Sequence, residues 1–130
     1  MASDKNQRSR LKKELVIWLA TVGKDTRPHV VPVWFWWDGE SFLIYSVPGQ
    51  KVRDIQANPN VALNFNTDPE GSQVFRLTGT AAVANDAPPA NKLPAYMRKY
   101  REQIKEFEWT PQSFAAQYHV PIRVRPVRFY

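Results

Sequence analysis

Cysteine is absent from this chain of 130 residues. The protein therefore has neither disulfides nor thiolate metal ligands, which fits a reducing compartment and makes a cytoplasmic location the expectation. The sequence has only two histidines, His29 and His119, and no acidic pair has the spacing of metal ligands, so we expect no metal site. No apolar run reaches the ~18 residues of a membrane-spanning helix, and segment 1–13 is polar and basic, unlike a signal peptide. We expect no membrane partner.

Glycine is also scarce, and its distribution excludes several enzyme classes. The chain has five glycines and none of them cluster, so neither a P-loop nor a dinucleotide-binding fingerprint is present. No G-x-S-x-G elbow occurs, which leaves a Ser-His-Asp hydrolase without support.

What the chain does contain is typical of one folded domain that binds an anion. Hydrophobic residues make up 43%, and the length suits a single domain over residues 1–130, with residues 1–7 as a flexible arm. Lys and Arg number 18 against 12 Asp and Glu, giving 18 − 12 = +6. This balance favours an anionic partner, which can be nucleic acid, a membrane surface or a phosphorylated small molecule.

Apolar runs and turn residues predict six strands, mostly joined by hairpins. The strands are expected at 15–22, 27–37, 41–47, 60–66, 73–84 and 120–129, and the helices at 8–14, 50–58, 91–107 and from Thr110 onward. Asp38-Gly39 is the strongest hairpin signal between them. The order indicates a mainly β protein, a six-stranded antiparallel barrel with peripheral helices.

The stretch 45–59 carries the clearest functional signal. A strand runs into a Pro-Gly turn and a short helix, in which Val52 and Ile55 share one face and can pack inward. Lys51 and Arg53 fall in the first turn, where the helix dipole disfavours cations and free N–H groups attract anions. The pair suggests a phosphate site, although two solvated charges on a surface turn would look the same.

The strand at 27–37 is bulky on both faces. Val31, Val33, Phe35 and Trp37 alternate with Val30, Pro32, Trp34 and Trp36. Only one face can point into a small barrel, so a partner subunit, a flat ligand or a helix of the same chain must cover the other. Pro32 predicts an edge position, because proline lacks a ladder donor.

The segment TVGKDTRPHVVPVWFWWDGESFLIYSVPGQKVRDIQANPNVALNF, residues 21–65, resembles the pyridoxamine 5'-phosphate oxidase-like split β-barrel family. It is most similar to the branch of flavin/deazaflavin-dependent oxidoreductases that uses coenzyme F-420. The matching pieces are LATV at 19–22, RPHVVPVWF at 27–35, Asp38-Gly39, K-x-R at 51–53, Asn58-Pro59, LTGTAAV at 77–83 and PIRVRPVRF at 121–129.

This resemblance implies a six-stranded FMN-binding split barrel that forms a homodimer and holds its cofactor in a groove between subunits. It implies that Lys51 and Arg53 hold the cofactor phosphate and that the strand from His29 to Val33 lines the ring system. The cofactor-binding residues expected from it are His29, Val30, Val31, Pro32, Val33, Tyr45, Ser46, Gln50, Lys51, Val52, Arg53 and Gln73.

The sequence also departs from the flavin oxidases of the family. Those proteins often carry Arg-Lys before the helix, where this chain has Gln50-Lys51. The resemblance therefore favours coenzyme F-420 over flavin mononucleotide (FMN), and hydride transfer to an unsaturated, hydrophobic or planar small molecule. The proton donor stays unassigned among Tyr45, Tyr96, Tyr100, Tyr130 and solvent.

An FMN-binding oxidase-like protein of the same fold is the first alternative. A basic barrel that binds nucleic acid is the second, with Trp34, Trp36 and Trp37 as stacking residues. Trp36 and Trp37 face opposite ways beside a tight turn and make a poor continuous platform, so we expect no nucleic-acid partner.

Overall fold

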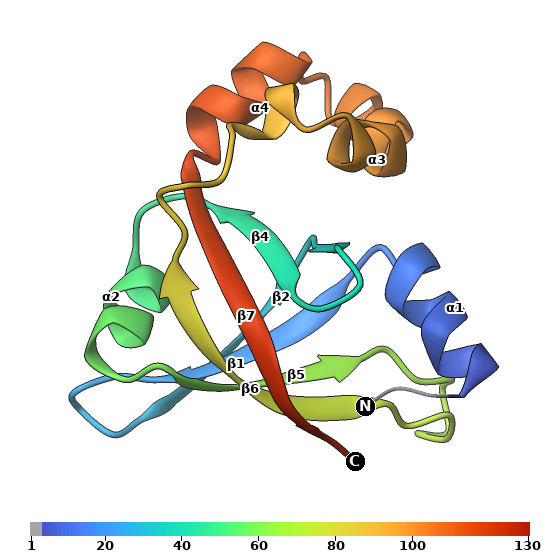
Figure 1. The fold of residues 1–130 in the computed structure, drawn as a ribbon, viewed down its shortest axis with the longest axis vertical. Coiled ribbons are helices and arrows are strands. Elements are labelled where there is room, and N and C mark those ends of the chain that lie inside the picture. The colour runs from blue at the N-terminus through green and yellow to red at the C-terminus, as the bar shows by residue number, and fades with distance from the viewer. Residues whose placement is uncertain (1–3) are drawn as a thin grey trace.

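The computed structural model describes residues 4–130, in which one antiparallel sheet curls into a half-barrel (Figure 1). The strands are β1 (Ile17–Val22), β2 (Pro28–Val33), β3 (Trp36–Trp37), β4 (Phe42–Ser46), β5 (Asn60–Phe65), β6 (Arg76–Val83) and β7 (Val120–Phe129). The helices are α1 (Lys5–Lys13), α2 (Gln50–Ala57), α3 (Pro94–Glu106) and α4 (Pro111–Gln117), with a short 3-10 helix η1 (Ala90–Lys92). The predicted mainly β class with peripheral helices is confirmed.

The described sheet has seven strands in the order β2-β1-β5-β6-β7-β4-β3, whereas the sequence predicted six. The difference arises because the single strand expected at 27–37 is broken at Trp34 and Phe35. The Phe35 N–H donates to the Tyr100 hydroxyl at 2.8 Å, and its carbonyl accepts from Lys99 Nζ at 2.8 Å. Side chains of α3 thus replace a neighbouring strand at this residue.

This break sends the two halves of the predicted strand to opposite edges of the sheet. β2 pairs with β1, in the register Ile17↔Val33, while β3 pairs with β4, in the register Trp36↔Leu43. Because β2 lies at an edge, the prediction made from Pro32 is confirmed. The backbone N–H and C=O groups on the outer side of β2 have no strand partner in the described sheet.

The N-terminal segment differs from the expected arm over residues 1–7. Residues 1–3 lie outside the described part, and α1 already begins at Lys5 because the Asp4 side chain accepts from the N–H groups of Asn6 and Gln7 at 2.7 and 3.2 Å. Leu11 anchors the helix in the barrel core.

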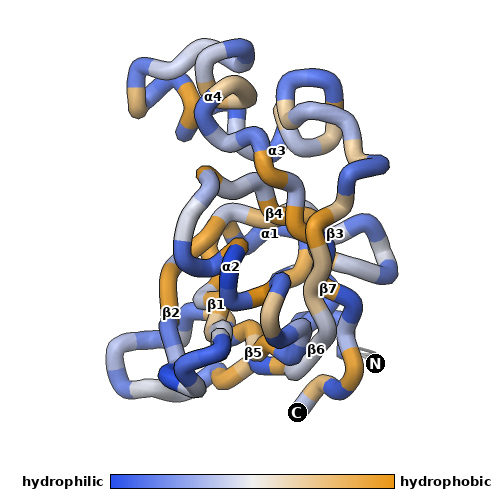
Figure 2. Tube along the Cα trace, turned by 90° about the vertical axis from the view of Figure 1, so that its left-hand side faces the viewer, coloured by the Kyte–Doolittle hydropathy of each residue, from blue (hydrophilic) through white to orange (hydrophobic). Residues whose placement is uncertain are grey.

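Two hydrophobic clusters lie one above the other. The first, here called the barrel core, fills the sheet with aliphatic side chains and phenylalanines, and α2 adds Val52 and Ile55 to it as predicted. The second, here called the cap cluster, lies between β4 and the helices α3 and α4, which stand over one end of the barrel (Figures 1 and 2). No helix within residues 4–130 is long and apolar enough to cross a membrane.

Local residues in the sequence fix where the cap helices α3 and α4 begin. Pro94 stands in the first turn of α3 and separates it from η1, which divides the helix expected over 91–107. Thr110 caps α4 as predicted: its side chain accepts from the Ser113 N–H at 3.0 Å, and Ser113 Oγ accepts from the Thr110 N–H at 2.9 Å.

Candidate functional site

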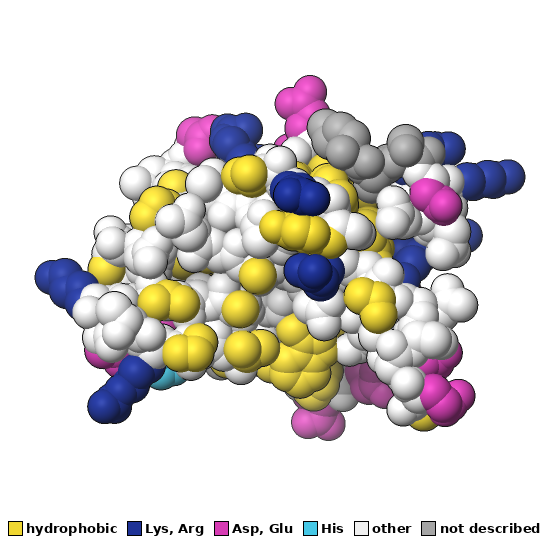
Figure 3. Space-filling view, turned by 90° about the horizontal axis from the view of Figure 1, so that it is seen from below, with side chains coloured by type: hydrophobic (Ala, Val, Ile, Leu, Met, Phe, Trp, Pro, Cys, Tyr) yellow, Lys and Arg dark blue, Asp and Glu magenta, His cyan; other side chains and the backbone are white. Residues whose placement is uncertain are grey.

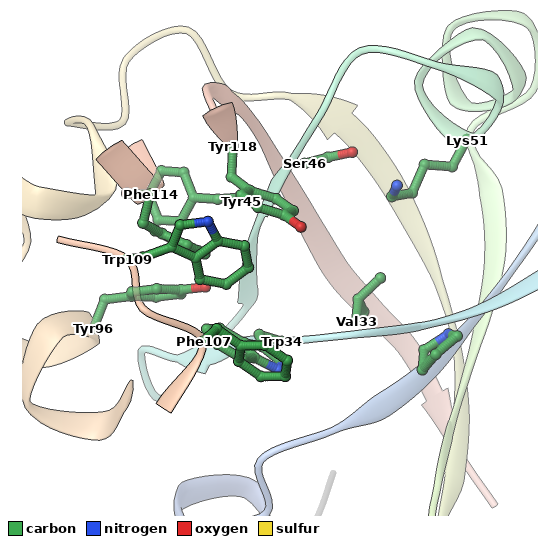
Figure 4. A pocket seen from close by; sticks show the side chains of 11 residues that line it. Val33, Trp34, Tyr45, Ser46, Lys51, Tyr96, Phe107, Trp109, Phe114 and Tyr118 are labelled. Carbon is green, nitrogen blue, oxygen red and sulfur yellow. The ribbon is translucent and has the colours of Figure 1, made fainter. Parts of the chain in front are cut away.

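The turn after β4 brings a cation to the start of α2. Gly49 precedes the helix and gives no side-chain cap, so the first N–H groups are left available to a ligand. Lys51 is half-buried and its side chain points into a pocket beside Ser46 and Val33 (Figure 4). Burial lowers the pKa of Lys51, and within residues 4–130 its ammonium has no ion-pair or hydrogen-bond partner.

A buried carboxylate fixes α2 against β1. Asp54 is 2% exposed and accepts from Thr21 Oγ1 at 2.8 Å and from Gln50 Nε2 at 2.7 Å. Burial raises its pKa, but these hydrogen bonds and the nearby His29 and Arg53 outweigh that effect and lower the pKa below its ordinary value. The helix start that carries Lys51 is therefore held rigidly to the sheet.

Glycine is required next to this carboxylate. A Cβ at Gly23 would lie 2.3 Å from Asp54 Oδ1, well inside van der Waals contact. The glycine after β1 thus makes room for the anchor of α2.

The pocket has a volume of about 270 Å³ and two chemically different ends (Figure 4). The polar end is formed by Ser46 and Lys51, with Pro32 and Val33 of the edge strand beside them. The other end is aromatic and draws on β4 and the cap; its rings are Trp34, Tyr45, Tyr96, Phe107, Trp109, Phe114 and Tyr118.

Trp34 organises the aromatic end from the break between β2 and β3. Its indole stacks on Tyr100 with ring centroids 4.5 Å apart and on Phe114 at 5.6 Å, and Trp109 meets it edge-on at 6.3 Å. Offset-stacked and edge-to-face pairs are the geometries that aromatic quadrupoles favour. The wall presents flat ring faces, which suit a planar molecule.

Five of the residues predicted to bind the cofactor line this pocket, namely Pro32, Val33, Tyr45, Ser46 and Lys51. The other seven lie elsewhere. His29, Val30 and Val31 lie further along β2, where Val30 is 57% exposed. Val52 points into the barrel core.

Three further residues predicted to bind the cofactor also lie outside the pocket lining. Gln50 donates to Asp54 and accepts from Arg53 Nη2 at 3.2 Å, and Arg53 itself is exposed. Gln73 lies before β6, and its carbonyl accepts from Arg10 Nη1 at 2.7 Å beside α1. The structure therefore brings Lys51 into the pocket and leaves Arg53 outside it.

Sequence reasoning missed most of the aromatic end. Tyr96 and Tyr100 entered the sequence analysis only as candidate proton donors, and Trp34 only as a bulky residue and a stacking residue of the nucleic-acid alternative. Phe107, Trp109, Phe114 and Tyr118 gave no signal, because their convergence depends on how α3 and α4 pack together. Among residues 4–130 no group of three His, Cys, Asp or Glu side chains could hold a metal ion.

The comparison with known families agrees with this fold. The family model of pyridoxamine 5'-phosphate oxidase matches residues 3–130, and the chain belongs to this family. No curated protein sequence matches the chain.

Proteins whose solved structures share this fold differ in function. An F-420 reductase is 29% identical, with 95% of this chain and 94% of that one covered and a TM-score of 0.67. An FAD-binding protein from Mesorhizobium loti is 20% identical, with 98% and 91% covered and a TM-score of 0.70. HutZ, a heme storage protein from Vibrio cholerae, is 14% identical, with 100% and 94% covered and a TM-score of 0.69. The last two establish likeness of fold alone.

Proposed function

We propose that this protein is an oxidoreductase that uses coenzyme F-420 and transfers hydride from the reduced cofactor to an unsaturated, hydrophobic or planar small molecule. One observation carries the proposal: a single pocket joins an unpaired, half-buried lysine at a helix N-terminus to a wall of flat aromatic rings. A phosphate-bearing cofactor held at the lysine end would leave the aromatic end for a planar substrate. The 29% identity to an F-420 reductase supports the choice within the family.

The residues at the polar end fit such a cofactor. A partly desolvated ammonium without a counterion gains more from an anion than a fully solvated one, because its hydration is already reduced. The free N–H groups of the first turn of α2 add hydrogen-bond donors beside Lys51, while the Ser46 hydroxyl donates to the Val47 carbonyl at 2.6 Å. These groups would hold the phosphate, and the outer backbone edge of β2 would meet the ring system.

A bound deazaflavin supplies the hydride chemistry, and the protein binds, orients and excludes water. Of the tyrosines considered as proton donors, Tyr100 is committed to Leu15 and Phe35, and Tyr130 lies at the C-terminus, at the opposite end of the barrel from the cap (Figure 1). Tyr45 and Tyr96 both line the pocket, with Tyr45 donating to the Pro88 carbonyl at 2.6 Å. The catalytic residue stays unassigned.

Titration of both cofactors against intrinsic fluorescence tests the proposal, because Trp34 and Trp109 line the pocket and report directly on occupancy. We expect coenzyme F-420 to quench the signal at a lower concentration than FMN does. Clearly tighter binding of FMN would replace the deazaflavin assignment by the flavin alternative. Trp34 and Trp36 pack in the cap cluster. This packing argues against the nucleic-acid alternative, in which both indoles would stack on bases.

We further propose that the protein is a homodimer. The exposed side chains Trp18 and Val30 border a shallow hollow on the outer face of β1 and β5, and a second hollow shares Ala20 and Ala62 with it and extends to Val127. Figure 3, which views the molecule from the end opposite the cap, shows hydrophobic side chains gathered on this face. Several exposed apolar side chains on one face are typical of a protein interface.

Sedimentation at micromolar concentration measures the oligomeric state. We expect a dimer, and Trp18→Glu should convert it to a monomer by placing a charge in the buried part of the interface. A stable monomer of the unmodified protein would contradict this proposal and leave the pocket as a site within one chain.

A further inference from the structure

The hydroxyl of Tyr96 is the one tyrosine group of the cap cluster that the fold buries without a partner. Tyr96 is 0% exposed, and its hydroxyl oxygen has no hydrogen bond within residues 4–130. Its neighbours differ: Tyr45 donates to the Pro88 carbonyl at 2.6 Å, and Tyr100 donates to the Leu15 carbonyl at 2.7 Å. A buried hydroxyl left unpaired is costly, and native proteins keep few such groups outside binding and catalytic sites.

Tyr96 occupies the aromatic end of the pocket. Its side chain extends from α3 toward the middle of the ring cluster, below Trp109 in the view of Figure 4. The ring meets Tyr45 edge-on with centroids 5.0 Å apart and lies nearly parallel to Phe114 at 6.1 Å. The hydroxyl is therefore a buried polar group without a partner, surrounded by rings at the end of the pocket opposite Lys51.

We propose that the aromatic end binds a flat, uncharged aromatic molecule that carries a hydrogen-bond acceptor, such as a carbonyl oxygen, and that the Tyr96 hydroxyl donates to that acceptor. The inference rests on the proposed function in one respect, namely that this molecule is the substrate. A charged ligand would fit poorly, because the cation of the pocket lies at the other end and ring faces cannot replace a lost hydration shell.

The role of Tyr96 as donor follows from its surroundings. Burial, together with the neighbouring tyrosines, raises the pKa of Tyr96 well above its ordinary value, so the hydroxyl keeps its proton throughout the physiological range. Such a group donates a hydrogen bond and does not pair with a cation. A hydrogen-bond acceptor on the ligand provides the partner that the Tyr96 hydroxyl lacks within residues 4–130.

We place the entry of this ligand at the turn between α3 and α4. Rings close the hydroxyl off from solvent, so a ligand reaches it by displacing a side chain. Phe107 is 61% exposed and Trp109 follows it in this turn, outside any helix, with Glu108 between them at a φ of 62°. Both rings line the pocket from this turn, and no helix or strand holds their backbone.

A matched pair of probes tests the hydrogen bond without any cofactor. We would measure binding of 2-acetylnaphthalene and of 2-ethylnaphthalene, which lacks only the carbonyl, by quenching of tryptophan fluorescence. The ketone should bind about three- to tenfold more tightly to the unmodified protein, the range of one neutral hydrogen bond. Tyr96→Phe should abolish this preference and leave the affinity for the hydrocarbon unchanged.

Tyr118→Phe is the control, since Tyr118 lines the same pocket and should keep the ketone preference. Denaturant unfolding supplies a second measurement: Tyr96→Phe should be as stable as the unmodified protein or more stable, because it loses an unpaired buried hydroxyl. A ketone preference that persists in Tyr96→Phe, the absence of any preference in the unmodified protein, or a large loss of stability in Tyr96→Phe would overturn the proposal. Failure of coenzyme F-420 to bind would overturn the proposed cofactor and leave this result standing.

Discussion

The barrel core and the cap cluster are both rich in aromatic rings but differ in chemistry. The barrel core uses phenylalanines such as Phe35, Phe42 and Phe65 among aliphatic side chains, and strand pairing surrounds it. The cap cluster uses tyrosines and tryptophans, so its rings carry polar groups that need partners. The first region is apolar, and the second combines ring packing with hydroxyl and indole N–H groups.

The two regions also differ in how they are held. The barrel core is closed by β-ladders between strands distant in the sequence. The cap helices contact mainly one another and η1, and side chains of α3 tie them to the sheet at Phe35. Regions with fewer ties to the main core open at lower free energy. The comparison predicts a stable barrel below a more easily opened cap.

The largest expected effect comes from two equivalent truncations, one in each region. Phe65→Ala, at a residue 1% exposed in the barrel core, should lower the free energy of unfolding by about 3–5 kcal/mol. Phe114→Ala, at a residue 2% exposed in the cap cluster, should cost less globally and mainly accelerate hydrogen exchange in α3 and α4. Denaturant unfolding and region-resolved hydrogen exchange measure both quantities. Equal losses, with exchange rising equally in the sheet, would show one cooperative unit.

A second prediction concerns the polar end of the pocket. Lys51→Ala should weaken binding of coenzyme F-420 by about 10- to 100-fold, because a charge-assisted hydrogen bond to phosphate contributes roughly 1.5–3 kcal/mol. Arg53→Ala, outside the pocket, should change affinity less than about fivefold, as for an exposed charge.

Thermal melts of the same two variants complete this test. Without cofactor, Lys51→Ala should melt at the same temperature or slightly higher, since it removes a desolvated cation from the positive end of a helix dipole. Unchanged cofactor affinity together with a clearly lower melting temperature would make Lys51 a structural residue.

The third effect is a pH dependence that arises where the cap is tied to the barrel. Burial lowers the pKa of Lys99 to about 7 from 10.5, and the charge of Glu14 opposes this shift only in part. Between these two values the unfolded chain binds more protons than the folded one, so stability should rise with pH, by at most about 1.4 kcal/mol per pH unit.

Lys99→Met removes this titration. The variant should therefore show a flatter rise in unfolding free energy between about pH 7 and pH 9, the interval that begins at the folded pKa of Lys99. Burial also raises the pKa of Tyr45 to about 12 from 10.0. This shift lowers stability only above the ordinary pKa of 10.0, so it does not affect the interval from about pH 7 to pH 9. Parallel pH profiles for the variant and the unmodified protein would contradict the assignment.

Local features of the sequence determined most of the secondary structure. The Asp38-Gly39 turn forms as expected, with the Asp38 carboxylate accepting from the N–H groups of Glu40 and Ser41 and Gly39 at a φ of 102°. The start of α2 at Gln50 was equally readable, and so was the position of Lys51 in its first turn. These features depend on neighbours within a few residues, which is why a sequence alone specifies them.

The tertiary structure decided the rest. The strand at 27–37 breaks because Lys99 and Tyr100, some 65 residues away in sequence, bind the backbone of Phe35. The aromatic wall likewise joins Trp34 to Trp109 and Phe114, which no local pattern connects. A pocket formed by side chains from distant segments exists only once the cap has packed on the barrel, because each ring gains its partners from the folded arrangement and not from its own sequence neighbours.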